Sequence, residues 1–348
     1  MIYKESSHWL PVSLEECMAM TPADMASKSA VVQNAYRYLV QTAGNIAEYS
    51  LRQRLMQVLK NPVPSFLQIY NDTERTRLWQ MLLHNKAIAE SVTQAEMFPP
   101  GSYSEQAPQP FWTAPGSSYD RHHSYPGGLA VHTAMNVRAS LELRKVYQET
   151  YGCRLNRDTI VAGQILHDSQ KPWILQWTAD GSCCKQIAIA GEGAHHVLGL
   201  AESIHRGFAP TVVLAQACTH NHPATRENAR EILNWIRIAC LLVNKDPGVF
   251  EQEMELDAEE FLPQLEWFVT YQGDHNWVLS VKAAKTVIKA VKQVAADVYK
   301  LEANGSKFHS FRNYLFSQQT ILKLYEMLVE QGFDRFKYFV CSMIYQGY

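Results

Sequence analysis

Histidine and aspartate residues recur through the middle of the 348-residue chain in a pattern that suits metal binding. The first stretch, RHHSYPGGLAVHT, covers residues 121–133, and LHDSQK follows at residues 166–171. In chain order the candidate ligands are His132, His167, Asp168, His195, His196, His220, His222 and Asp246. Imidazole nitrogens and carboxylate oxygens together are common ligands of divalent metal ions. The pattern therefore predicts a buried metal centre.

The spacing of these residues favours convergence on one point. Intervals of 25 to 35 residues separate His132 from His167, Asp168 from His195, His195 from His220, and His220 from Asp246. Each interval fits one helix and its connection, and in an antiparallel bundle such intervals return each ligand to a similar level. A lone histidine is more often an ordinary core or surface residue, so the joint pattern carries the prediction. Asp168 has two carboxylate oxygens and is the candidate bridge between two ions.

Helices are expected to position these residues. Apolar residues recur at intervals of three and four, and proline and glycine mark the ends of the segments. From the first candidate onward, the predicted helices span residues 129–147, 156–168, 194–206, 210–221, 225–245, 278–301, 317–331 and 333–345. Two short β-type runs, 173–177 and 185–190, flank Asp180 and Gly181 and predict a hairpin. We therefore expect an all-α fold with a small β-hairpin insertion.

Two regions precede the candidate ligands. Residues 1–96 are predicted to be helical, with Ser13 and Glu16 forming a capping box, and are expected to pack against the later bundle or to form a homodimer contact. Residues 97–120 hold five prolines and several aromatic rings, so a continuous helix is excluded. This long loop is expected either to wrap the mouth of the site or to cover the core between two helical subdomains.

Composition limits which binding partners and which cellular locations are expected. Lys and Arg number 32 against 34 Asp and Glu, so no global basic field attracts nucleic acid, and a nucleic-acid end would need a local patch. No apolar run is long enough to span a bilayer, and the N-terminus does not read as a signal peptide. The 7 cysteines include no Cys-x-x-Cys pair, which is typical of reduced residues. We expect a cytoplasmic protein without a membrane partner.

The chain resembles the HD superfamily of metal-dependent phosphohydrolases. PGGLAVHT is similar to the helix start of HD-type 3′→5′ exoribonucleases and of some relaxase-associated HD domains, where a GGLLEHT-like string recurs. HDSQK is similar to the family's HDxGK, with Gln170 in place of the glycine and Lys171 retained. The resemblance covers about residues 121–248. It implies a helical HD bundle at residues 121–250, with residues 251–348 forming a helical region packed on it.

The resemblance also implies a ligand set. His132, His167 and Asp168 match the family's first three ligands, and His195 matches the fourth because a glycine follows four residues on. His196 is its neighbour, and one of the pair is expected to point elsewhere. His220 matches the fifth ligand, with His222 as the alternative. The family's final Ala-Asp pair is absent, and Asp246 is expected to be the last ligand, with Asn244 as its alternative.

The implied activity is hydrolysis of a phosphoester on a nucleotide, cyclic dinucleotide or oligonucleotide end. One or two divalent ions, drawn from Mn, Fe, Ni, Zn, Co and Mg, would activate water, with Asp168 as their bridge. Lys171 would offset charge on the phosphoryl oxygens, and His122 or His123 would bind phosphate or protonate the leaving group. Two alternatives keep the site but change its use. They are a non-catalytic module that senses a ligand or partner, and a di-iron oxygenase.

Overall fold

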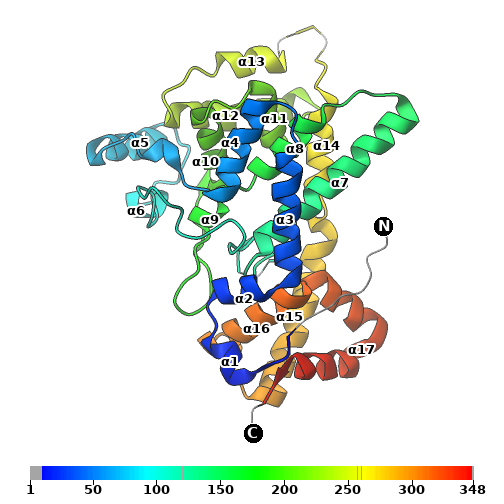
Figure 1. Cartoon of the computed structure of the whole chain (residues 1–348). Coiled ribbons are helices and arrows are strands. Elements are labelled where there is room, and N and C mark those ends of the chain that lie inside the picture. Colours follow the sequence, from blue (N-terminus) through cyan, green and yellow to red (C-terminus); the bar gives the residue numbers. More distant parts are fainter. Residues whose placement is uncertain (1–9, 120, 257, 260, 347–348) are drawn as a thin grey trace.

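The computed structural model describes residues 10–119, 121–256, 258–259 and 261–346, and over these residues the fold is all-α (Figure 1). The strands are confined to pairs of two residues: β1 (Val12–Ser13) is parallel to β4 (Ile344–Tyr345), and β2 (Ala188–Ile189) is antiparallel to β3 (Glu192–Gly193). Within the described ranges, no helix has both the length and the apolar character needed to cross a membrane.

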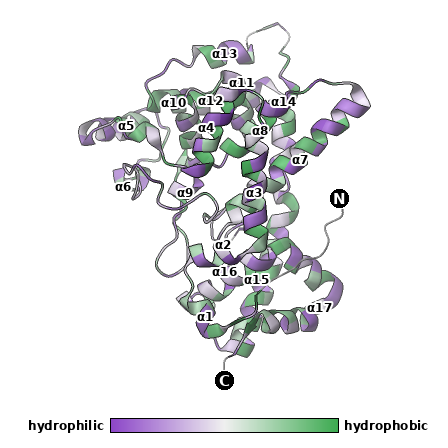
Figure 2. Ribbon diagram, in the orientation of Figure 1, coloured by the Kyte–Doolittle hydropathy of each residue, from purple (hydrophilic) through white to green (hydrophobic). Residues whose placement is uncertain are grey.

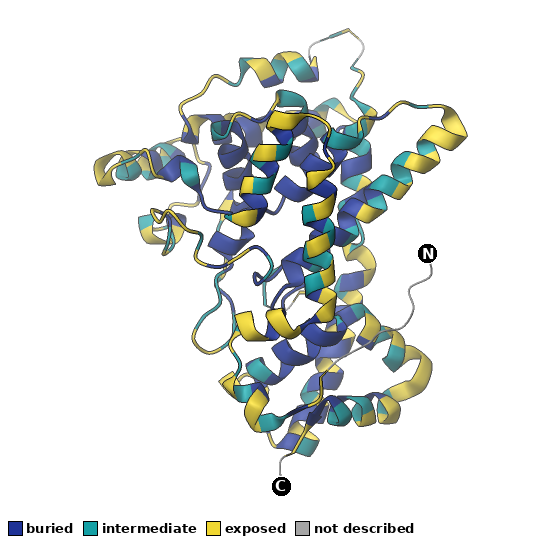
Figure 3. Cartoon of the chain, in the orientation of Figure 1, coloured by how far each residue is buried: buried dark blue, intermediate teal, exposed yellow. Residues whose placement is uncertain are grey.

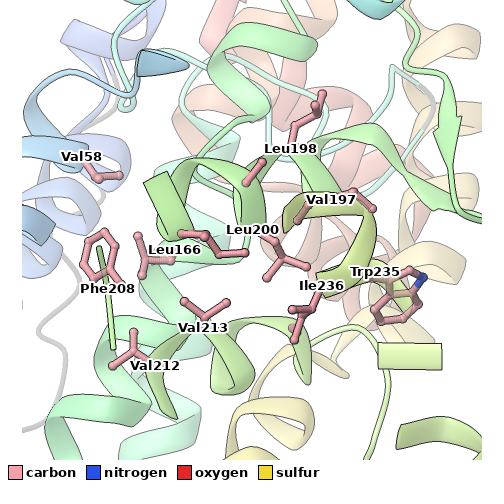
Figure 4. Close-up of a cluster of buried hydrophobic side chains, with 14 of the residues drawn as sticks. Val58, Leu166, Val197, Leu198, Leu200, Phe208, Val212, Val213, Trp235 and Ile236 are labelled. Carbon is pink, nitrogen blue, oxygen red and sulfur yellow. The ribbon is translucent and has the colours of Figure 1, made fainter. Parts of the chain in front are cut away.

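A central bundle forms the larger part of the molecule. Its helices are α7 (Gly128–Tyr151), α8 (Arg157–Leu166), α10 (Ala194–His205), α11 (Pro210–Ala217), α12 (Arg226–Leu242) and α14 (Leu265–Asp274). Helix α8 packs between α7 and α11, and α14 lies against both α7 and α8. Leu166, Val197, Val213 and Ile236 are buried where these helices meet (Figure 4). Leu166 directly precedes His167, so this apolar packing fixes the end of α8.

The N-terminal helices cover one flank of the bundle. They are α3 (Ala30–Gly44), α4 (Tyr49–Lys60), the 3₁₀ turn η1 (Ser65–Leu67), α5 (Asp72–His84) and α6 (Gln94–Met97). Helix α3 runs along α7, and Figure 3 shows its outer side exposed while the helices behind it are buried. The buried Glu202 of α10 accepts hydrogen bonds from the Ser65 hydroxyl and the Phe66 backbone, which ties η1 to the bundle.

A second, smaller core lies at the other end of the molecule. It is built from α1 (Leu14–Ala19), α2 (Pro22–Lys28), α15 (Trp277–Tyr299), α16 (Ser306–Gln319) and α17 (Ile321–Met343). Helix α15 begins beside the end of α14 and runs into this core, so it joins the two ends (Figure 1). Figure 2 shows the amphipathic pattern of these helices, with apolar and polar residues alternating along the ribbon. The predicted Ser13–Glu16 capping box is confirmed at α1.

Three local predictions are corrected. Residues 171–174 form the short helix α9 (Lys171–Ile174), so the predicted hairpin is reduced to a turn at Asp180 with one bridge between Trp177 and Cys183, while β2 pairs with β3. Helix α16 was not predicted. The predicted helices 317–331 and 333–345 fall largely within α17, whose non-helical Gly332 lies at the predicted break. Helix α14 was not predicted. The segment α13 (Gly248–Met254) and the acidic residues after it obscured the helical spacing that starts at Leu265.

The proline-rich loop covers part of the main core, which is one of the two roles expected for it. Phe111 and Ala114 are fully buried in the main core. Two residues further on, the Gly116 carbonyl accepts a hydrogen bond from Lys171 at 2.7 Å. The loop therefore covers apolar surface and also places a backbone carbonyl next to the HDSQK segment.

Candidate metal centre

Six side chains from five helices converge in the central bundle and form what is called here the histidine–aspartate cluster. Its members are His132 on α7, His167 and Asp168 at the end of α8, His195 on α10, His220 after α11, and Asp274 at the end of α14. Several of their donor atoms lie within 4.8 Å of one another in groups able to hold a metal ion. Five of the six were predicted from the sequence.

Gly127 and Gly128, at the start of α7, help to position His132. Gly127 has a φ of 83°, which favours glycine, and a Cβ on it would lie 2.4 Å from Val32. A Cβ on Gly128 would lie 2.0 Å from the His123 carbonyl oxygen. The backbone of residues 123–128 therefore folds tightly over the start of α7, which places the His123 ring 4.9 Å from the His132 ring.

The first donor set is compact. His132 Nε2 lies 3.2 Å from Asp168 Oδ2 and 3.2 Å from Asp274 Oδ1. His167 Nε2 lies 3.2 Å from Asp168 Oδ2 and 3.6 Å from Asp274 Oδ1, and the two Nε2 atoms are 3.3 Å apart. Two imidazoles and two carboxylates thus face a single point. This is a mixed nitrogen and oxygen set of the kind that divalent transition metals accept.

The other oxygen of Asp168 faces a second set. His195 Nε2 lies 3.1 Å from Asp168 Oδ1, yet within the described part of the chain neither atom has a hydrogen-bond partner of good geometry. The His220 ring lies 5.4 Å from the His195 ring and 6.0 Å from the His167 ring. Two ligand-type atoms that lie this close without a hydrogen bond between them have the spacing expected of two ligands of one cation. The geometry thus leaves Asp168 able to bridge two positions.

Neighbouring groups set the orientation of the imidazoles. His167 Nδ1 lies 2.7 Å from the Gln164 carbonyl oxygen, and His195 Nδ1 lies 2.6 Å from Gln186 Oε1. Both partners are acceptors, so each Nδ1 carries a proton and each Nε2 points into the cluster. Hydrogen bonds of this kind orient metal-binding histidines and raise their basicity.

The ionisable groups of the cluster shift one another's pKa values strongly. Burial alone would raise the pKa of Asp168, but His167 and Lys171 hold that pKa well below its usual range, and the pKa of Asp274 is depressed against burial by His132 and His167. Burial would lower the pKa of His167, and the two carboxylates outweigh it and raise that pKa to about 10. A proton on His167 thus sits where a metal ion would neutralise the same two carboxylates.

Lys171 and the adjacent histidines line one side of the cluster. The buried Lys171 ammonium donates to Asp168 Oδ2 and to the Gly116 carbonyl. His123 is buried, and burial followed by the neighbouring His122 and His132 lowers its pKa well below the usual range. His122 is partly exposed, and burial lowers its pKa to about 3. Both rings are therefore held neutral beside the first donor set.

Other predicted residues lie outside the grouped donors. His196 is stacked on His220 with ring centroids 4.0 Å apart, and its ring is also nearly perpendicular to that of Trp235, with centroids 5.1 Å apart. His222 lies against Asn228, whose amide nitrogen is 3.0 Å from its Nδ1. The structure places His196 behind His220, with His195 as the member of the pair that faces Asp168.

The prediction for the last carboxylate is corrected by the geometry. Asp246 is exposed and accepts a hydrogen bond from the Gly248 backbone, and Asn244 is exposed with a φ of 51°. Both follow the end of α12, whereas Asp274 at the end of α14 enters the cluster. The signal that could have located it is the helical spacing of Trp267, Thr270 and Asp274.

The fold and the site together define an all-helical protein with a buried histidine–aspartate cluster able to hold a metal ion. In sequence, the chain is similar to the dihydroneopterin 2′,3′-cyclic phosphate phosphodiesterase of Methanocaldococcus jannaschii, with 27% identity over 282 residues. The match covers 77% of this chain and 96% of the relative. No family model matches the sequence, and no solved structure matches it.

Proposed function

We propose that this protein is a metal-dependent phosphodiesterase of the HD type that hydrolyses a cyclic phosphodiester on a nucleotide-sized molecule. The observation that carries the proposal is the position of Asp168, whose two oxygens face two separate sets of imidazoles. The sequence similarity supports the reaction class, because the relative's name describes a phosphodiesterase that acts on a 2′,3′-cyclic phosphate.

The residues present fit one or two divalent ions. His132, His167, Asp168 and Asp274 would hold the first, and Asp168, His195 and His220 would contribute to the second. Asp168 Oδ1 and His195 Nε2 lie 3.1 Å apart without a hydrogen bond among the described atoms, a spacing that suits two ligands of one cation. When bound, such ions supply Lewis acidity to a phosphoryl oxygen and make water a better nucleophile at neutral pH.

The chain's own residues would orient the reacting groups. Lys171 is held by the Gly116 carbonyl and Asp168, so its ammonium adds positive charge near the phosphoryl oxygens. His123 Nε2 has no hydrogen-bond partner within the described structure and is near the first donor set. A neutral imidazole there suits hydrogen bonding to a phosphoryl oxygen better than protonation of a leaving group.

Hydrolysis of a cyclic phosphodiester follows a simple balance. A water oxygen forms a bond to phosphorus, one ester P–O bond breaks, and the released alkoxide takes a proton that derives from the water. The product is a phosphomonoester on the same sugar. Substrate can approach from the side of His220 and Asp274, whose side chains are 14% and 13% exposed, while Asp168 and His167 are fully enclosed.

The test is hydrolysis of a nucleoside 2′,3′-cyclic phosphate by protein loaded with Mn²⁺, with the monoester product followed by ³¹P NMR. The double variant His167→Ala/Asp168→Ala is expected to lose about 1,000-fold or more in kcat/KM, because it removes one ligand and the proposed bridge. His84→Ala is the matched control, since His84 is exposed at the end of α5.

Persistence of turnover in the double variant would contradict the proposal. Oxygen consumption by iron-loaded protein without phosphoester cleavage would point to the di-iron oxygenase alternative. Tight nucleotide binding without turnover across a panel of metals and phosphoesters would point to the sensing module.

A further inference from the structure

A ladder of four aromatic rings lies beside the exposed edge of the histidine–aspartate cluster. Its members, called the aromatic ladder here, are His222, Tyr271, His275 and Trp277. The His222 and Tyr271 rings meet edge-on with centroids 5.2 Å apart, and the Tyr271 and His275 rings are 3.6 Å apart with an interplanar angle of 34°. The His275 and Trp277 rings are 6.0 Å apart. The series thus runs continuously from the loop after α11 to the start of α15.

The ladder is anchored to the two partly exposed members of the cluster. His222 lies two residues after His220, and Tyr271 lies one helical turn before Asp274 on α14. One turn of an α-helix rises about 5.4 Å, so the ladder begins at a short distance from the cluster. Hydrogen bonds fix its rings: Asn228 contacts His222, and His275 Nδ1 donates to the Tyr271 carbonyl.

The outer end of the ladder is apolar and exposed. The Trp277 side chain is 48% exposed, and Val278 and Leu279 beside it are 68% and 53% exposed. Apolar residues exposed together are typical of binding surfaces. Aromatic rings supply a flat face on which heteroaromatic rings stack with little dependence on their exact identity.

We propose that the aromatic ladder is a subsite that stacks a fused heteroaromatic ring of the substrate, of the purine or pteridine type, while the phosphate lies at the histidine–aspartate cluster. This inference rests on the proposed function, and it adds the class of group attached to the phosphate. The ring and the phosphate would be separated by a sugar or a short polyol. In this arrangement Trp277 favours substrates that carry a fused ring and takes no part in bond cleavage.

The experiment compares substrates with and without a ring in the full-length, metal-loaded protein. Guanosine 2′,3′-cyclic phosphate and dihydroneopterin 2′,3′-cyclic phosphate carry a fused ring, and glycerol 1,2-cyclic phosphate carries only the cyclic phosphate. For Trp277→Ala, the ratio of kcat/KM for a ring-bearing substrate to kcat/KM for the ringless one is expected to fall about 5- to 100-fold. The loss is expected mainly in KM. The two ring-bearing substrates separate a purine preference from a pteridine preference.

Two variants serve as controls. Trp277→Phe keeps a stacking face and is expected to retain the ratio to within about threefold. Tyr338→Ala removes an aromatic ring that is 65% exposed on α17, and is expected to leave the ratio unchanged. An unchanged ratio in Trp277→Ala would overturn the inference and leave the proposed function intact.

Failure of the proposed function gives a different result. If the wild-type protein cleaves none of the three substrates under any metal, the binding of guanosine 5′-monophosphate and of neopterin is measured by titration calorimetry. Weaker binding to Trp277→Ala than to wild type would still support the stacking subsite. Equal binding, or no binding to the wild type, would overturn it.

Discussion

The histidine–aspartate cluster and the polar face of α16 are both deeply buried, but their polar atoms are satisfied in different ways. Along α16, Arg312 donates to the carbonyl of Ser124, and Asn313 donates to that of Gly181 at 2.7 Å. In the cluster, by contrast, ligand-type atoms face one another, as His195 Nε2 faces Asp168 Oδ1 at 3.1 Å. Backbone carbonyls accept the hydrogen bonds of the α16 side chains, whereas the contact in the cluster joins two groups that are both able to bind a metal ion.

This difference separates a structural polar cluster from a functional one. Buried polar groups cost free energy when they lack partners, so the hydrogen bonds that Arg312 and Asn313 make on α16 stabilise the fold. The contacts of Arg312 with Ser124 and Tyr119 hold the segment that leads to His122 and His123. A set that lacks partners destabilises the fold, and its presence indicates that a ligand supplies the missing interactions. The contacts of α16 therefore support the segment that carries His122 and His123, whereas in the cluster His195 Nε2 and Asp168 Oδ1 approach without a hydrogen-bond partner among the described residues.

The sharpest test of the comparison concerns the last carboxylate. Asp274→Ala is expected to weaken Mn²⁺ or Zn²⁺ binding by about 100-fold or more, because a ligand and half of the buried negative charge are lost together. Asp246→Ala is the matched control and is expected to bind metal as the wild type does, since Asp246 is exposed. Metal titration with inductively coupled plasma mass spectrometry measures both. A large loss of metal affinity in Asp246→Ala, with Asp274→Ala unchanged, would instead identify Asp246 as the ligand.

A smaller loss of metal affinity is expected when Gln186, which orients His195, is substituted. Gln186→Leu removes the acceptor of the His195 Nδ1 proton, so metal affinity is expected to fall by about 10-fold while the ligands stay in place. Gln148→Leu, at an exposed position of α7, provides the control for the change in side-chain type. The measurement is competition with a chromophoric chelator. If both variants bind metal equally well, Gln186 is not a support of the centre.

The smallest effect on metal binding is expected from a substitution on the polar face of α16. Arg312→Met leaves the Ser124 and Tyr119 carbonyls without their donor, and is expected to lower the free energy of unfolding by about 2–4 kcal/mol. The metal affinity of the folded chain is expected to change by less than about threefold. Urea denaturation with and without metal separates the two quantities. Arg335→Met is the control, because Arg335 is exposed on α17 and contacts Tyr338.

A large loss of metal affinity in Arg312→Met, with stability unchanged, would break the comparison. It would mean that the polar face of α16 acts on the cluster and not on the fold around it.

Local signals explain why much of the site could be predicted. His132 follows a glycine pair that the turn requires, and His167 and Asp168 are adjacent at the end of a helix with a clear N-cap at Asn156. The apolar periodicity of residues 129–147 and 194–206 predicted helices that α7 and α10 confirm. These features depend on residues close in sequence, so the sequence carries them directly.

The choice between His195 and His196 needed the tertiary structure. Successive residues on an α-helix point about 100° apart, so only one of the pair can face Asp168. Which one does so depends on how α10 is rotated against α8 and α12, and that rotation is set by buried residues such as Val197 and Ile236 packing from different helices (Figure 4).

The amino-acid sequence by itself determined the helical class, the ends of several helices and most of the histidines that meet in the bundle, because each is marked by residues within one or two turns. Only the tertiary structure decided that Asp274, and not Asp246, enters the cluster. That choice depends on α14 packing against α7 and α8, a contact between segments more than 100 residues apart that no local pattern encodes.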